Sequence, residues 1–168
     1  MGLVTSLERL ARGRTCIVGM GNTIRRDDAV GVYIAERVRG GAVSGGVTVV
    51  NAEDVIENYV WQIAGGDAEN VIIIDAVRSG AEAGSVLFGR LHEFDELIGN
   101  HSTHKLALRL SGRVIEERDK KAWLLGIEVL DTDYGTGLTD RVKKSADMIS
   151  DLLLRYFNSE QKEPRYEH

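Results

Sequence analysis

Proline, cysteine and histidine are scarce in this sequence. Among 168 residues there is one proline, Pro164, and one cysteine, Cys16. A single cysteine allows no internal disulfide and no cysteine-based zinc cluster, which fits a reducing cytoplasm. Only 4 histidines are present, so a metal site would have to take most of its ligands from carboxylates.

Excess positive charge and long apolar runs are also absent. The 21 Lys and Arg residues are outnumbered by 26 Asp and Glu, and the net charge of −5 gives no electrostatic basis for binding nucleic acid. No apolar run approaches the roughly 18 residues of a membrane-spanning helix. The first residues lack the apolar core of a signal peptide. We therefore expect a cytoplasmic protein with no nucleic-acid partner and no membrane insertion.

Short β-branched runs alternate with helical patterns along the chain. The predicted strands cover residues 15–20, 47–50, 71–74, 85–91 and 122–129, and the predicted helices cover residues 27–38, 54–64 and 139–157. Residues 102–118 alternate like a strand but have the length of a helix, which favours helix. The alternation predicts a single α/β domain over residues 1–158, a three-layer sandwich around a mostly parallel sheet. A polar, flexible tail is expected at 159–168.

A glycine-rich segment from Gly19 to Gly31 leaves the first predicted strand. Its Gly-x-Gly start suggests dinucleotide binding, but Ile24 stands where the third glycine of that fingerprint belongs. Asp27 and Asp28 at the following helix start would also repel a phosphate. The structural alternative is that one aspartate caps the helix and the other lies on its surface.

Two further segments carry residues suited to catalysis or metal binding. Asp75 directly follows a buried strand, at the strand end where open α/β sheets bind ligands; alternatively it hydrogen-bonds the next turn. His101 and His104 are three residues apart at a predicted helix start, where the helix dipole keeps an imidazole neutral. A solvated surface pair is the alternative for these histidines.

Topology links these residues into one predicted site. If the first and third predicted strands are neighbours, their carboxyl ends bring Asp28 and Asp75 to the same crevice. A helix starting at His104 would complete a set of two carboxylates and one imidazole. Such a set suits a divalent ion such as zinc or nickel.

Other side chains are weaker candidates. Acidic residues after two other strands, at 53–54 and at 131–133, are expected to line the same crevice. Cys16 lies inside a strand and is predicted to be a buried, inert thiol. Trp61 and Trp123 are predicted to be core or half-core residues, and His92 a surface residue.

Several short motifs follow one another in a family-specific order. They are GMGN at 19–22, DDAVG at 27–31, VIIIDA at 71–76, STH at 102–104, LGI at 125–127 and GLT at 137–139. In order and spacing the chain resembles the hydrogenase maturation endopeptidases, over about residues 15 to 157. The resemblance implies a mixed five-stranded sheet in the order 2-1-3-5-4, with strand 4 antiparallel and helices on both faces.

The resemblance also implies an activity and a site. These hydrolases cut a C-terminal extension from the large-subunit precursor of a nickel–iron hydrogenase after nickel insertion. The metal-contacting positions fall on Asp28, Asp75 and His104. The expected metal is nickel carried by the precursor, although zinc or cadmium would suit the same ligands. The catalytic group is not assigned, and Asp28 and Asp75 are the candidates for an aspartyl-type or metal-assisted reaction.

Substrate contacts are expected at Gly21, Asn22 and Glu53. The sequence departs from the family near the last of these, because the frequent Asp-Gly-Gly after the second strand is here Asn51-Ala52-Glu53. Two other functions fit the same residues: a non-enzymatic nickel-binding or chaperone-like module, and a general metal-dependent peptidase or amidohydrolase.

Overall fold

A five-stranded mixed sheet forms the middle layer of the protein. The computed structural model describes residues 2–41, 43, 45–98 and 103–158, and describes only the backbone of Thr103 and His104. The strands are β1 (Thr15–Met20), β2 (Val47–Glu53), β3 (Asn70–Val77), β4 (Val86–Arg90) and β5 (Lys121–Glu128). Their order is β2-β1-β3-β5-β4, with β4 antiparallel to β5 and the other pairs parallel. The predicted order and orientation are confirmed.

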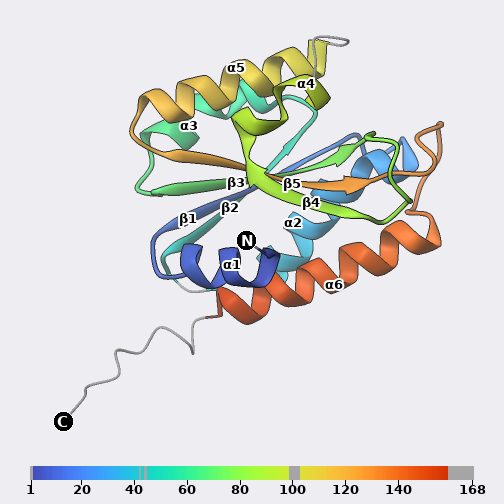
Figure 1. The fold of residues 1–168 in the computed structure, drawn as a ribbon, viewed down its shortest axis with the longest axis horizontal. Coiled ribbons are helices and arrows are strands. Elements are labelled where there is room, and N and C mark those ends of the chain that lie inside the picture. Colours follow the sequence, from blue (N-terminus) through green and yellow to red (C-terminus); the bar gives the residue numbers. More distant parts are fainter. Residues whose placement is uncertain (1, 42, 44, 99–102, 159–168) are drawn as a thin grey trace.

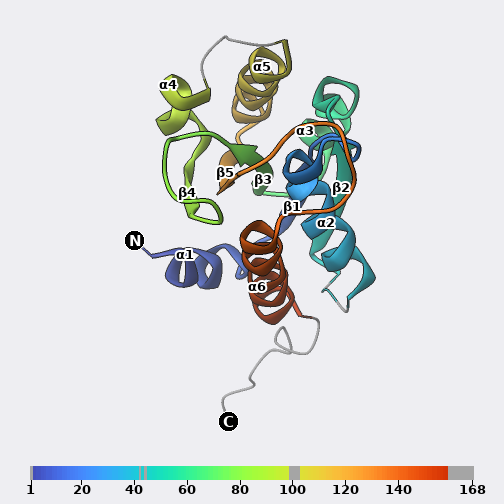
Figure 2. The same ribbon diagram turned by 90° about the vertical axis from the view of Figure 1, so that its right-hand side faces the viewer.

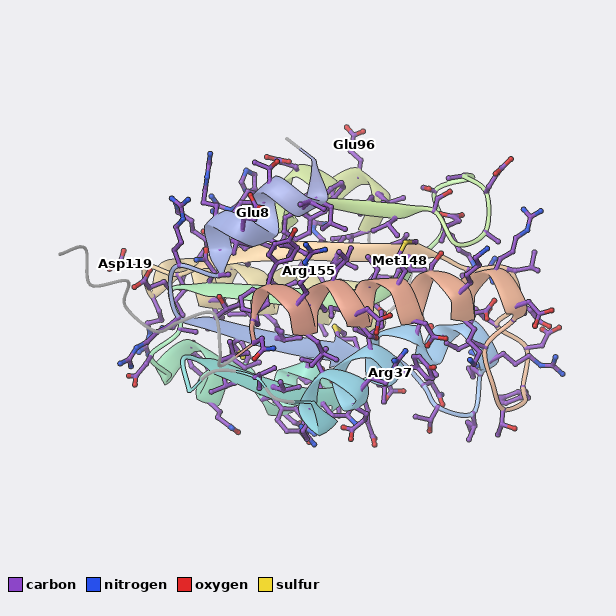
Figure 3. The ribbon with its side chains drawn as sticks, turned by 90° about the horizontal axis from the view of Figure 1, so that it is seen from below. Glu8, Arg37, Glu96, Asp119, Met148 and Arg155 are labelled. Carbon is purple, nitrogen blue, oxygen red and sulfur yellow. The ribbon has the colours of Figure 1, made fainter. Side chains whose placement is uncertain are left out.

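Helices cover both faces of the sheet (Figures 1 and 2). One face carries α1 (Leu3–Leu10), α2 (Val30–Gly40) and α6 (Asp140–Tyr156). The other carries α3 (Val60–Gly65), α4 (Asp95–Ile98) and α5 (Thr103–Glu117). Seen from below, α6 crosses its face of the sheet between α1 and α2 (Figure 3), and Arg37 of α2 pairs there with Asp147 of α6. None of the described helices is both long and apolar enough to cross a membrane.

The central strand β3 is buried on both faces of the sheet. Its apolar run alternates between two core clusters, because successive side chains of a strand point to opposite faces. Ile72 and Ile74 pack with α2 and α6, whereas Val71 and Ile73 pack with α3 and α5. Burial of each such side chain contributes about 1.5–3 kcal/mol. A continuous apolar run is therefore what this position requires.

Short 3₁₀ helices connect several of these elements. They are η1 (Arg26–Ala29), η2 (Ile56–Asn58) and η3 (Leu91–Phe94). The helix predicted over 54–64 is thus divided between η2 and α3. The ambiguous residues 102–118 form helix α5 from Thr103 onward, as their length favoured.

Several predictions for single residues can be compared with the structure. Cys16 is buried as predicted, and burial raises the pKa of its thiol. His92 is exposed and Trp123 is partly buried, also as predicted. The prediction for Trp61 is wrong, because the short helix α3 turns this side chain outward and leaves 66% of its surface exposed. His101, Ser102 and the tail at 159–168 lie outside the described residues.

Candidate active site

The carboxyl ends of β1 and β3 bring the two predicted site aspartates to one pocket. Asp75 lies near the end of β3, and Asp28 lies in η1, shortly after β1. Both side chains line a pocket of about 320 Å³. Its apolar wall includes Leu97, Leu108 and Leu124. The predicted meeting of Asp28 and Asp75 follows from the parallel pairing of β1 with β3 and is confirmed.

Asp75 is an almost fully buried carboxylate with a cationic neighbour. Only 1% of its surface is exposed. Its Oδ1 accepts a hydrogen bond from the Ala76 amide at 2.8 Å, and its Oδ2 lies 3.3 Å from the Lys105 Nζ. The same ammonium donates to the Ala76 carbonyl oxygen at 3.2 Å. A buried charge needs such partners, because removal from water is otherwise very costly.

Asp28 is held from the loop that follows β1. Its Oδ2 accepts a hydrogen bond from the Asn22 amide at 2.9 Å. The Asn22 side chain in turn accepts one from the Ile24 amide at 3.1 Å, which fixes the turn. Gly21 has a φ of +143°, and a Cβ there would lie 1.9 Å from the Asp28 carbonyl oxygen. Only glycine therefore allows the chain to pass so close to Asp28.

Asp27 has a different environment from its neighbour Asp28. Its buried carboxylate accepts hydrogen bonds from the backbone amides of Leu130, Asp131 and Thr139, at 3.0, 3.0 and 2.7 Å. The Thr139 hydroxyl donates to it as well, at 2.8 Å. Burial acts to raise the pKa of Asp27, but these hydrogen bonds outweigh it and lower the pKa below its ordinary value.

This arrangement settles which of the two aspartates has the structural role. Asp27 joins the loop after β1 to the loop after β5, while Asp28 faces the pocket. Thr139 is the N-cap residue of α6, but its hydroxyl bonds Asp27 and makes no cap hydrogen bond to the helix.

The predicted substrate contact Glu53 is the last residue of β2. Its backbone is left-handed, with a φ of +50°, and its carbonyl accepts a hydrogen bond from the Gly21 amide at 2.7 Å. A left-handed residue is a natural place for glycine, which gives a physical reason for the glycine that the family often has here. Among the residues that the structure describes, Thr132 lines the pocket. The acidic residues expected there do not: Glu53, Asp54, Asp131 and Asp133.

His104 is placed only by its backbone, in the first turn of α5. Its side chain lies outside the described part of the structure. Among the side chains that are described, no three His, Cys, Asp or Glu residues form a metal-binding group. The structure thus brings together two of the three predicted ligands. His104 lies in the first turn of α5, the helix whose Lys105 lines the pocket.

Sequence reasoning missed two cationic residues of the pocket, Lys105 and Arg78. Arg78 donates a hydrogen bond to the Thr132 hydroxyl at 2.6 Å. Lys105 follows the predicted ligand His104, and Arg78 lies three residues after Asp75. That proximity in sequence was the available signal.

Exposed apolar side chains lie on the two loops that Asp27 joins. Ile24, Leu130 and Tyr134 are all largely exposed, and the Arg25 guanidinium lies 4.8 Å from the Tyr134 ring centre. The loops are paired by backbone hydrogen bonds between Ile24 and Gly135 and between Arg26 and Gly135. We call Ile24, Leu130 and Tyr134 the apolar rim.

The fold and the paired carboxylates define a class of hydrolase, and comparison with known proteins identifies it. The family model for hydrogenase maturation proteases matches residues 32–156. This chain belongs to that family, and it is an endopeptidase. No curated protein sequence matches it significantly.

Solved structures show the same fold. The [NiFe] hydrogenase maturation protease HycI from Thermococcus kodakarensis is 29% identical, with a TM-score of 0.80 over 90% of this chain and 98% of that one. The hydrogenase maturating endopeptidase HybD from E. coli is 22% identical, with a TM-score of 0.74 over 84% and 90%. The HybD protease from T. kodakarensis is 20% identical, with a TM-score of 0.70 over 86% and 99%.

Proposed function

We propose that this chain removes the C-terminal extension from the large-subunit precursor of a nickel–iron hydrogenase after nickel insertion. It would recognise the precursor's nickel through Asp28, Asp75 and His104. The observation that carries this proposal is the meeting of Asp28 and Asp75 in one pocket, with Asp75 almost fully buried. We infer a cytoplasmic site of action from the single cysteine, which fits a reducing compartment.

The donors of the pocket fit a divalent ion that the precursor brings. Carboxylate oxygens and an imidazole bind nickel, and they would also accept zinc or cadmium. No described group donates a hydrogen bond to the Asp28 Oδ1, so this oxygen is open toward a ligand. The Lys105 ammonium lies beside Asp75, which supports the proposal that this carboxylate binds positively charged groups. His104 lies four residues before Leu108 in α5, about one helical turn from a residue that lines the pocket, which supports its role as the third ligand.

Nickel held by the precursor would fix the scissile bond relative to this chain. Such positioning turns hydrolysis into a reaction between groups already in place. Asp28 or Asp75 would activate water as a general base, and the precursor's nickel or a protonated carboxyl would polarise the scissile carbonyl. The sequence has no His-Glu-x-x-His motif, the helix that supplies zinc ligands and base in ordinary zinc proteases.

The apolar rim supports a protein as the substrate. Contiguous exposed apolar side chains are typical of protein–protein contacts. Leu130 and Tyr134 sit on the loop that also supplies Thr132 to the pocket, so a bound protein would cover the rim and the pocket together. We propose that Gly21, Asn22 and Glu53 also contact the precursor, because the Asn22 amide bonds Asp28 and the Gly21 amide bonds the Glu53 carbonyl.

The test uses purified precursor with and without nickel. We expect the wild-type chain to shorten the nickel-loaded precursor, seen as a loss of mass, and to leave the nickel-free form intact. Asp28→Asn, Asp75→Asn and His104→Ala should each reduce cleavage by at least about 100-fold. Asp67→Asn is the matched control, because this carboxylate is exposed and pairs only with Arg14 at 2.9 Å.

The outcomes distinguish the alternatives. Cleavage that is independent of nickel would contradict recognition of the metal, and full activity of His104→Ala would contradict its role as a ligand. Formation of a complex with no loss of mass would support a chaperone-like module instead. Turnover of short peptides without any hydrogenase would support a general peptidase.

A further inference from the structure

The pocket already contains a cation of the protein itself. The Lys105 Nζ lies 3.3 Å from the Asp75 Oδ2 and 3.2 Å from the Ala76 carbonyl oxygen. Asp75 is buried on β3, whereas 28% of the Lys105 side chain is exposed. The ammonium that reaches this buried carboxylate therefore belongs to a side chain that is partly exposed to solvent.

Asp75 has limited capacity for a further cation. The Ala76 amide donates to its Oδ1, and the Lys105 ammonium lies on its Oδ2. A divalent ion bound to this carboxylate would stand within a few ångströms of the ammonium. Beside a carboxylate that is almost fully buried, the two positive charges would repel each other. Metal binding at Asp75 thus requires either that the ammonium moves away or that the binding free energy of the metal exceeds this repulsion.

Lysine is suited to such a role. Its ammonium is a compact point charge on a flexible four-carbon chain, so it can leave one acceptor without disturbing the backbone. The Ala76 carbonyl provides a second acceptor close to the first. An arginine would hold the carboxylate with a rigid two-pronged fork, and a neutral side chain would put no positive charge against Asp75.

We propose that Lys105 is a specificity-determining residue that keeps free divalent ions out of the pocket. This inference rests on the proposed function, in which nickel arrives bound to the precursor. A free ion must displace the ammonium with its own affinity alone. A precursor-bound ion displaces it with the additional binding free energy of the whole protein contact, which includes the apolar rim. The pocket consequently responds to metal on the substrate and not to metal in solution.

The test measures binding of free Ni²⁺ to the purified full-length chain by competition with a chromogenic chelator. Lys105→Met removes the charge and keeps an unbranched, flexible side chain that is one atom shorter. We expect it to bind Ni²⁺ at least about tenfold more tightly than the wild type, a change of about 1.4 kcal/mol. Lys105→Arg should bind as weakly as the wild type, because the charge is retained.

Two controls separate this effect from a structural one. Lys143→Met removes a lysine that pairs with Asp147 on α6, on the other face of the sheet, and should leave the Ni²⁺ affinity unchanged. Adding Asp75→Asn to Lys105→Met should abolish the gain. Circular dichroism verifies folding, and Lys105→Gln replaces the Met variant if that one is unfolded.

Equal Ni²⁺ affinity of the wild type and the charge-neutral variants would overturn the proposal. So would a gain that Lys105→Arg shares, since the charge would then be irrelevant. In the cleavage assay, free Zn²⁺ should inhibit Lys105→Met at lower concentrations than the wild type. If no variant cleaves the precursor, the proposed function fails, while the Ni²⁺ affinities still decide the role of Lys105.

Discussion

Asp27 is the residue whose replacement should most clearly separate stability from chemistry. Its carboxylate is buried and accepts backbone hydrogen bonds from Leu130, Asp131 and Thr139. In Asp27→Asn one of the two oxygens becomes an amide nitrogen, which faces a backbone N–H and cannot accept its hydrogen bond. At least one buried donor is then unsatisfied, at a cost of about 1–3 kcal/mol.

The loss of charge adds to this cost. Hydrogen bonds to a charged acceptor are roughly twice as strong as neutral ones, so the remaining bonds weaken as well. Together we expect Asp27→Asn to lower the free energy of unfolding by about 2–4 kcal/mol near neutral pH. That is a large part of the total, since domains of this kind are stable by only about 5–15 kcal/mol.

The dependence on pH has a definite sign. The pKa of Asp27 is lowered from 3.8 by the hydrogen bonds that outweigh its burial. Its contribution to stability is therefore fully present above the ordinary pKa and is lost as the pH falls through the lowered one. The difference between wild type and Asp27→Asn should be constant above about pH 5 and shrink below about pH 4.

Urea unfolding followed by circular dichroism at a series of pH values measures this difference. The control is Asp67→Asn, since an exposed ion pair contributes less than about 1 kcal/mol. A loss for Asp27→Asn below about 0.5 kcal/mol would refute the reasoning from buried donors. A loss that is the same at all pH values would refute the part assigned to the charge.

Two other substitutions test the loops around the pocket. Gly21→Ala should lower the free energy of unfolding by about 2–4 kcal/mol and impair cleavage, because the new Cβ would collide with the Asp28 carbonyl and the φ of this residue is positive. The control is Gly40→Ala, whose Cβ would have no atom within 4 Å and which should change the urea midpoint little. Equal midpoints for the two variants would contradict the clash. Tyr134→Ala should leave stability within about 0.5 kcal/mol, because the ring is exposed. Tyr134→Ala should nevertheless slow precursor cleavage by about tenfold. Met148→Ala on α6 is the control and should leave the cleavage rate unchanged. An unchanged rate for Tyr134→Ala would exclude the Tyr134 ring from the substrate contact.

The sequence predicted the frame of the fold because its strands have a simple pattern. Residues 71–74 form a β-branched run buried on both faces, and such a run is typical of the centre of a parallel sheet. Once β1 and β3 are neighbours, the position of Asp75 relative to Asp28 follows from topology alone. The site could be predicted to this extent without any coordinates.

Other elements depended on contacts that one sequence does not reveal. Helix α1 was not predicted, although Leu3, Leu7 and Leu10 have helical spacing, because its eight residues gain stability only by packing on the sheet and α6. Trp61 was predicted to be a core or half-core residue, but a helix as short as α3 has too few turns to bury every apolar side chain. Lys105 pairs with a carboxylate thirty positions away in the chain, a contact that spacing within one helix cannot indicate.

The pair Asp27 and Asp28 shows why adjacent identical residues cannot be told apart from sequence. Both lie in η1, where successive side chains are about 120° apart around the axis because three residues complete a turn. One carboxylate therefore points to the loop after β5, and the next points to the pocket. The main effect of Asp27→Asn should consequently be a lower free energy of unfolding. Asp28→Asn should instead reduce the rate of cleavage and keep nearly all of its stability. Because Asp27 also ties down the loop that carries Leu130 and Tyr134, it fixes the apolar rim relative to Asp28. Under the proposed function, two neighbouring residues of one short helix would therefore set the distance between the proposed substrate contact and the proposed nickel ligand.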